Sequence, residues 1–463
     1  MTQNIKHILR YGTNAEQKYI ENLHYTFDTL AINGNMLAYT PGALAKFLMT
    51  HCLDLDRKGC FFIDPITHAF QHSIDKIKTY NKKNKKFVIK KSISNLINCY
   101  GEPIKSKIAS NKIIIPNDFS NYNIKENFCT NVINFQLNTI KEQLNKKGFL
   151  EYFCGEKDLL DKLEPCFVIP PYFYITESTY NDWLPLNIEF INIAKKLYKN
   201  KNIFGQLVIS KEVLTSKSFR EDVSEKYSSC EIKDLLIWID DFNEHEASIN
   251  LLEGYIDLIK CLNKNNINVY NLYGGFFSIM LTKSKEELGF QLKGVGHGLE
   301  YGEHRAVVPV GGGIPTSKYY YYPLHQRLDY KLSSELLETL GYFEDKVQGA
   351  EKYYKDICKC NECKEVIQHD IENFSKFENT EFYNVTIKGV KQRRPYASQK
   401  TKEICIMHYQ FCKQKEFKNV SEKSINYILK YLKTMHELYK SLGVLSLEQL
   451  SYINNWRKAL ENE

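Results

Sequence analysis

The sequence predicts an α/β protein, with a TIM-like (β/α)8 barrel as the first choice and a doubly wound parallel sheet as the alternative. Short apolar segments alternate with amphipathic helices, and glycines or carboxylates follow several of the apolar segments. This alternation is typical of parallel βα units. Candidate strands lie near residues 28, 61, 167, 204, 236, 269 and 291, and one more is expected within 307–322, which gives close to the eight strands of a barrel.

The N-terminal part begins with a short strand at 27–33 and a helix around 42–51. The run Cys60-Phe-Phe-Ile-Asp64, followed by Pro65, has the form of a buried parallel strand that leaves a sheet. Asp64 then lies at the carboxyl end of a strand, where α/β folds hold their chemistry. The alternative is a plain turn residue. Residues 76–162 are rich in Lys and Asn and predict a helical insertion.

In the middle of the chain, a strand at 166–175 is interrupted or ended by Pro170 and Pro171. The strands at 203–209 and 235–239 follow, and the second runs into Asp240-Asp241. A helix then carries Ile249, Leu252, Ile256 and Ile259 on one face, and a strand at 268–272 runs into Gly274-Gly275. The barrel is assigned to residues 1–350, a metal-binding subdomain to 351–418 and two closing helices to 419–463. Ser446 and Gln449 form a capping box at the start of the last helix.

Composition indicates a globular protein of the cytoplasm. The 463 residues are 43% hydrophobic and 25% charged, and they contain no apolar run of membrane-spanning length and no signal-like N-terminus. The 13 cysteines are scattered, which favours a reducing compartment. The net charge of +7 is concentrated in two clusters, Lys82–Lys91 and Lys388–Arg394. Such clusters bind phosphate backbones or are solvated surface.

The run Cys358-Lys-Cys360-Asn-Glu-Cys363 places three thiols on one short turn. A histidine from a later segment, His408, would complete a tetrahedron around Zn²⁺. His369 and Cys405 are the reserve candidates for the fourth ligand, and three unrelated cysteines are the alternative interpretation. A closed four-ligand site stabilises a fold and does no chemistry. The run Tyr319–Tyr322 is interpreted as core, with a base-stacking surface as the alternative.

Several islands of the sequence resemble the tRNA-guanine transglycosylase superfamily, including relatives that insert 7-deazaguanine into DNA. They are the Asp64-to-Gln71 segment, Phe204-Gly-Gln206, Tyr273-Gly274-Gly275, Gly294-Val-Gly296, and the cysteine motif with its downstream His408. The resemblance implies a zinc-bearing barrel that exchanges or recognises guanine or a 7-deazaguanine in tRNA or DNA. It makes Asp64 a catalytic carboxylate, Gln206, Gly274 and Gly275 the residues that read the purine, and Cys358, Cys360, Cys363 and His408 the zinc ligands.

The sequence departs from this family at the nucleophile. The segment Thr316–Leu324, which precedes the cysteine motif, contains no aspartate. Base exchange needs a carboxylate that attacks the sugar, and tyrosine is a poor substitute because its pKa is near 10. Asp64 is the preferred replacement; the other candidates are Asp240, Asp241, Glu300 and Glu303.

Two further classes of function stay open. One is a catalytically inactive barrel that serves as a nucleic-acid-binding or scaffold subunit, with protein partners or as a homo-oligomer. The other is a small-molecule glycosidase or phosphate-handling barrel whose zinc is structural. A carboxylate in an open pocket near Asp64 would favour an enzyme, whereas a pocket blocked by aromatic rings would favour the scaffold.

Overall fold

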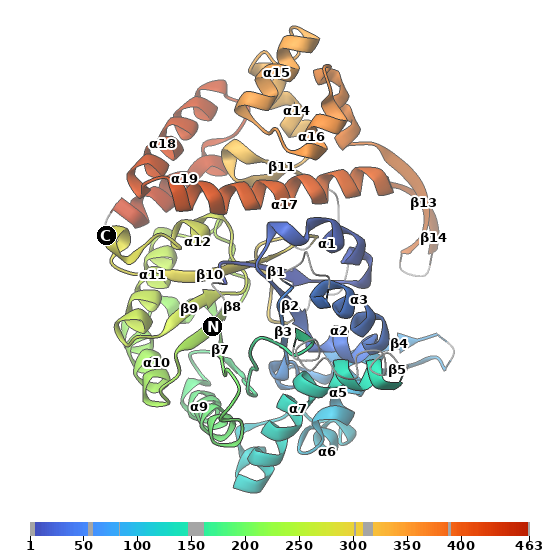
Figure 1. Ribbon diagram of the computed structural model, residues 1–463, viewed down its shortest axis with the longest axis vertical. Helices are drawn as coiled ribbons and strands as arrows, with labels where there is room; N and C mark the ends of the chain where they lie inside the picture. Colours follow the sequence, from blue (N-terminus) through green and yellow to red (C-terminus); the bar gives the residue numbers. More distant parts are fainter. Residues whose placement is uncertain are drawn as a thin grey trace. The chain divides into compact units, whose positions relative to one another are not determined.

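The computed structural model describes residues 5–53, 59–82, 84–146, 162–300, 302–308, 318–387 and 390–461. The chain divides into two compact units, Met1–Gly311 and Gly312–Glu463. In Figure 1 the first unit runs from blue to yellow and the second from yellow-orange to red.

Unit 1 is built on a curled parallel sheet of eight strands in the order β3-β2-β1-β10-β9-β8-β7-β6. Apart from β3 and β6, strands of this sheet that follow one another along the chain are neighbours, and the first strand, β1, pairs with the last, β10, through His7 and Val295. The strands are β1 (His7–Tyr11), β2 (Thr29–Asn33), β3 (Phe61–Asp64), β6 (Tyr174–Ile175), β7 (Gly205–Ile209), β8 (Asp234–Ile239), β9 (Asn268–Asn271) and β10 (Leu292–Gly298).

The predicted α/β class with parallel strands is confirmed, whereas a complete barrel is not shown. Strands β3 and β6 are the two edges of the sheet, and no ladder joins them in the described part of the chain. The segment before β6 reaches β3 through the hydrogen bond from Cys166 N to Phe61 O (2.9 Å). Pro170 and Pro171 then interrupt this segment, because proline has no backbone N–H to donate.

The strand expected within 307–322 is wrong as a member of this sheet. Tyr319–Tyr321 (β11) pairs antiparallel with Gln326–Leu328 (β12) in unit 2, while Thr316 and Ser317 lie outside the described residues. The eighth place is taken by β1, which the sequence did not predict. Polar residues at positions 7 and 10 interrupt the apolar pattern of this segment, so it does not resemble a buried strand. Its His7 and Arg10 become buried only when β1 pairs with β2 and β10.

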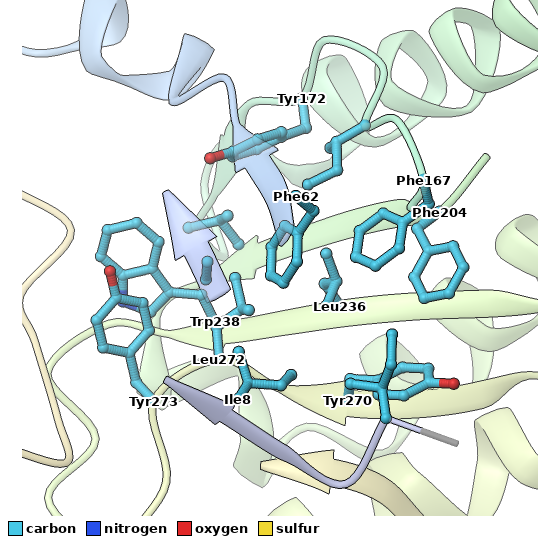
Figure 2. Packing of buried hydrophobic residues seen from close by; sticks show 14 of the residues in the cluster. Ile8, Phe62, Phe167, Tyr172, Phe204, Leu236, Trp238, Tyr270, Leu272 and Tyr273 are labelled. Atoms are coloured by element: carbon cyan, nitrogen blue, oxygen red, sulfur yellow. The ribbon is translucent and has the colours of Figure 1, made fainter. Parts of the chain in front are cut away.

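The inner face of the sheet is packed with aromatic side chains (Figure 2). The rings of Phe167 and Phe204 stack with centroids 3.7 Å apart, and those of Trp238 and Tyr273 lie 4.5 Å apart. Aromatic and aliphatic side chains therefore fill much of the interior of the curled sheet.

Helices cover the outside of the sheet (Figure 1). The predicted insertion between β3 and β6 is helical as expected, with an additional hairpin of β4 (Lys78–Asn81) and β5 (Lys86–Ile89); its residues 147–161 lie outside the described part. The helices are α1 (Gln17–Leu23), α2 (Gly34–Tyr39), α3 (Pro41–Leu53), α4 (Ile74–Ile77), α5 (Lys91–Tyr100), α6 (Ile104–Ala109), α7 (Tyr122–Lys146), α9 (Tyr180–Leu197), α10 (Lys217–Ser229), α11 (Ile249–Lys264), α12 (Phe276–Met280) and α13 (Lys285–Leu288).

Unit 2 is mainly helical. The predicted capping box is confirmed, since Ser446 N donates to Gln449 Oε1 (2.8 Å) and Gln449 N donates to Ser446 Oγ (3.2 Å). No helix in the described ranges is both long and apolar enough to cross a bilayer. Besides β11 and β12, unit 2 contains α14 (Tyr330–Thr339), α15 (Lys346–Asp356), α16 (Asn361–Ile367), β13 (Thr380–Ile387), β14 (Val390–Ala397), α17 (Gln399–Glu422), α18 (Ile425–Leu442) and α19 (Leu447–Glu461).

Candidate metal centre and inner-face polar cluster

The three predicted cysteines and His408 form one cluster in unit 2. Backbone N–H groups fold the cysteine turn around its own sulfurs: Cys360 N lies 3.5 Å from Cys358 Sγ, and Cys363 N lies 3.4 Å from Cys360 Sγ. Helix α17 supplies His408, whose Nδ1 lies 3.2 Å from Cys363 Sγ and 3.6 Å from Cys360 Sγ. The four ligand atoms all lie within 4.8 Å of one another. A tetrahedral metal site separates its ligand atoms by about 3.5 Å, so this cluster can hold a metal ion.

Residues around the cluster fix its ligands. His408 Nε2 lies 2.8 Å from the backbone O of Tyr320, so it donates there and leaves Nδ1 free to bind a metal. The ring of Tyr319 stacks on the imidazole at 4.6 Å, and Tyr353 OH lies 3.2 Å from Cys363 Sγ. All four tyrosines of the run Tyr319–Tyr322 are buried, which confirms the interpretation of this run as core.

A fourth sulfur, which the sequence did not predict, lies beside the cluster. Cys412 is one turn after His408 on α17, with its Sγ 3.8 Å from His408 Nδ1 and 4.0 Å from Cys358 Sγ. The sequence feature that could have identified Cys412 is its spacing of four residues from His408, which places both side chains on one face of a helix. Hydrogen bonds from the thiols of Cys360, Cys363 and Cys412 hold the pKa of Cys358 well below its usual value. Such a thiolate is the form that binds metals.

Neither reserve ligand belongs to the cluster. His369 is exposed, and the thiol of Cys405 faces Phe377 O at 3.9 Å.

A buried network of charges lies further along α17. The carboxylate of Glu416 accepts hydrogen bonds from Lys413 Nζ (2.8 Å) and Tyr320 OH (2.6 Å), and its Oε1 lies 2.6 Å from His325 Nδ1. Lys413 and Glu416 are fully buried. This network joins β11 to α17 through side chains, and the carbonyl of Tyr320 that orients His408 belongs to the same strand.

In unit 1 the structure brings Asp64 and Gln206 together on the inner face of the sheet. Asp64 is only 3% exposed and accepts hydrogen bonds from Ile66 N (3.0 Å) and Tyr172 OH. Burial raises the pKa of Asp64, while its contacts with Tyr172, with Ile66 N and then with Gln206 lower it. Gln206 is 2% exposed, and neither Nε2 nor Oε1 of its amide has a hydrogen-bond partner in the described part of the chain. We name Asp64 and Gln206 the inner-face polar cluster.

The predicted glycine pair belongs to a different group of contacts. Gly274 N donates to Gly296 O (2.9 Å). A Cβ added to Gly275 would lie 2.8 Å from Oε2 of both Glu244 and Glu303, so this glycine allows two carboxylates to approach the backbone. Glu244 accepts a hydrogen bond from Ser278 Oγ (2.5 Å), and burial raises its pKa to about 7. No hydrogen bond joins the glycine pair to Asp64 or Gln206 in the described residues.

Segment 302–308 covers the carboxyl ends of β7 and β8. The backbone O of Arg305 accepts hydrogen bonds from Trp238 Nε1 and Asp241 N (3.0 Å each), and Val307 N donates to Asp240 Oδ1 (2.6 Å). Beside it lies a cavity of about 330 Å³ that neither Asp64 nor Gln206 lines. The cavity is lined by Lys76, Lys211, Glu212, Asp240, Asp241, Ala306 and Val308.

The loop after β10 carries Glu300 and Glu303 at the carboxyl end of the last strand of the sheet. These two carboxylates follow β10, the last strand of this sheet in chain order. No family model and no curated protein matches the chain, so its function is inferred from the geometry of the metal cluster and the inner-face polar cluster.

Proposed function

We propose that the protein recognises a guanine or 7-deazaguanine base of tRNA or DNA at Asp64 and Gln206, in a TIM-like barrel of transglycosylase type. The observation that supports this proposal most is the buried amide of Gln206, which lies beside Asp64 and makes no hydrogen bond of ordinary geometry in the described residues. A buried polar group without a hydrogen bond costs about 1–3 kcal/mol. The edge of guanine offers N–H donors beside a carbonyl acceptor, so it satisfies both amide atoms. Asp64 adds a carboxyl group at the same place.

We also propose that the metal of unit 2 is Zn²⁺. Three thiols and one imidazole in a closed tetrahedral arrangement are the donor set that proteins use for structural zinc. In this proposal the zinc stabilises unit 2 and takes no part in chemistry at Asp64.

The purine proposal predicts that Gln206→Ala weakens binding of guanine or 7-deazaguanine to the purified protein. Loss of two hydrogen bonds, at about 1 kcal/mol each, lowers affinity about 30-fold. Titration calorimetry measures this loss, and Gln291→Ala, which changes a glutamine that donates to Thr282 O, is the control. Equal affinity of Gln206→Ala and the unchanged protein contradicts the proposal.

A second candidate function is a nucleic-acid-binding or scaffold subunit without catalysis. The packed aromatic interior favours it.

We therefore expect no covalent adduct between the protein and guanine-containing RNA or DNA. Denaturing electrophoresis after incubation with labelled nucleic acid tests this prediction. An adduct that survives denaturation and disappears in Asp64→Asn would make Asp64 the nucleophile. An adduct that persists in Asp64→Asn but is lost in Glu300→Gln or Glu303→Gln would assign the attack to the loop after β10. Either adduct would show that exchange chemistry is retained.

A further inference from the structure

The hairpin of β4 and β5 carries a dense positive charge. Residues 76–91 contain eight lysines and no acidic residue. In Figure 1 the hairpin (pale blue) extends away from the helices of unit 1. Lys82, Lys85 and Lys86 are exposed at or beside its loop, and Lys83 lies outside the described residues. A segment of this charge attracts phosphate groups.

Two aromatic rings stand exposed between these lysines. Tyr80 and Phe87 are direct partners in the hairpin register, so their side chains share one face. Tyr80 is 51% and Phe87 is 68% exposed, and their ring centroids lie 5.4 Å apart. Neither side chain contributes to the buried core. Because burial of aromatic rings is favourable, two exposed rings among like charges mark a surface that binds a partner.

The same combination occurs in unit 2, on the hairpin of β13 and β14. Phe382 is 62% exposed, and the guanidinium of Arg393 lies 5.0 Å from the centre of its ring. Lys391 and Arg394 follow on the same strand, while Lys388 lies outside the described residues. The two sequence-predicted basic clusters therefore each lie on a hairpin that also exposes an aromatic ring.

We propose that the β4–β5 hairpin binds an unpaired strand of nucleic acid, with bases stacked on Tyr80 and Phe87 and phosphates held by the lysines. Exposed rings stack on bases that are not already paired, whereas lysines alone do not distinguish a single strand from a duplex. A membrane is the less favoured partner, because the loop 82–85 consists of Lys and Asn and has no apolar residue to insert. This inference rests on the proposed function, to which it adds the surface that holds the strand.

Fluorescence anisotropy with labelled thymidine and uridine homopolymers of about 20 nucleotides tests this inference. These strands contain no purine, so their binding is independent of Gln206 and the purine proposal can fail separately. The double variant Tyr80→Ala/Phe87→Ala is expected to bind them at least about tenfold more weakly with the same salt dependence. The double variant Lys85→Gln/Lys86→Gln is expected to lower the slope of log K against log salt by about 1.4. Tyr39→Ala, an exposed tyrosine on α2, is the control.

Equal binding of single strands by the unchanged protein and the aromatic double variant would overturn the inference. Preferential binding of a duplex would also overturn it. If the aromatic double variant binds phosphatidylserine vesicles more weakly than the unchanged protein but binds the homopolymers equally well, the hairpin is a membrane-binding surface instead. Every substituted side chain is exposed, so we expect all variants to melt at the temperature of the unchanged protein. Thermal unfolding checks that the fold is retained.

Discussion

The Cys360→Ser variant is expected to lose its bound metal and to have a markedly less stable second unit. Cys360 belongs to the turn that holds two of the other ligands, and it opens α16. Structural zinc contributes on the order of 10 kcal/mol to the folding of small domains. A loss of even a third of this free energy lowers the melting temperature of a unit of this size by about 10 °C. Elemental analysis and thermal unfolding measure the two effects.

Two further variants on α17 are informative controls. Cys405→Ser changes a buried cysteine outside the cluster, so we expect it to retain one metal ion per chain. Cys412→Ser tests the fourth sulfur: retained metal identifies the three cysteines of the turn and His408 as the ligands, and lost metal adds Cys412 to the set. Full retention of the metal in Cys360→Ser would show that the cluster is not a metal site.

Glu416→Gln is expected to destabilise unit 2 by about 3–5 kcal/mol, because it removes one partner of a buried ion pair and leaves the charge of Lys413 uncompensated. Glu422→Gln is the control. It changes an exposed carboxylate on the same helix, paired with Lys418 at 3.9 Å, and we expect it to cost less than about 1 kcal/mol. Urea unfolding at neutral pH compares the two variants. Similar stabilities for both would contradict this prediction.

The same carboxylate predicts an acid-dependent loss of stability. Burial alone raises the pKa of Glu416, but the charge of Lys413 and contact with His325 prevail and hold it at about 2. Since the pKa in the folded protein is lower than the ordinary value of 4.5, this stabilisation is complete above about pH 4.5 and is lost as the pH falls towards 2. The unchanged protein therefore loses more stability than Glu416→Gln over this interval. Parallel pH profiles of the two proteins would contradict this expectation.

Local sequence patterns predicted most strands, because a strand buried on both faces is a continuous apolar run. They could not identify β1, whose polar His7 and Arg10 are buried only through contacts with distant strands. They also assigned Tyr319–Tyr321 to the wrong sheet, since a tyrosine run favours a strand without specifying its partner. The gap between β3 and β6 coincides with Pro170 and Pro171, which the sequence did identify as an interruption.

In the candidate sites, too, local features could be predicted from the sequence, whereas features that depend on distant segments could not. The cysteine turn is local, so its spacing alone predicted the cluster with His408, which is confirmed as a group that can hold a metal. Cys412 becomes visible only once α17 is known to be one continuous helix. The burial of Asp64 could not be predicted, because Tyr172, which bonds its carboxyl group, comes from a segment 108 residues away. The roles of Gln206, Gly274 and Gly275 as purine-reading residues stay predictions.

The pairing of β1 with β10 has a consequence for biosynthesis. His7 leaves the ribosome long before its partner Val295 is made. At about 5–20 residues per second, translation of the intervening chain takes on the order of 15–60 s. During this interval β1 pairs with β2 on one side while its other edge remains unsatisfied. A strand edge whose backbone groups wait this long for their partner is a site for misassociation between nascent chains, so we expect production of this protein in cells to depend strongly on chaperones that bind nascent polypeptides.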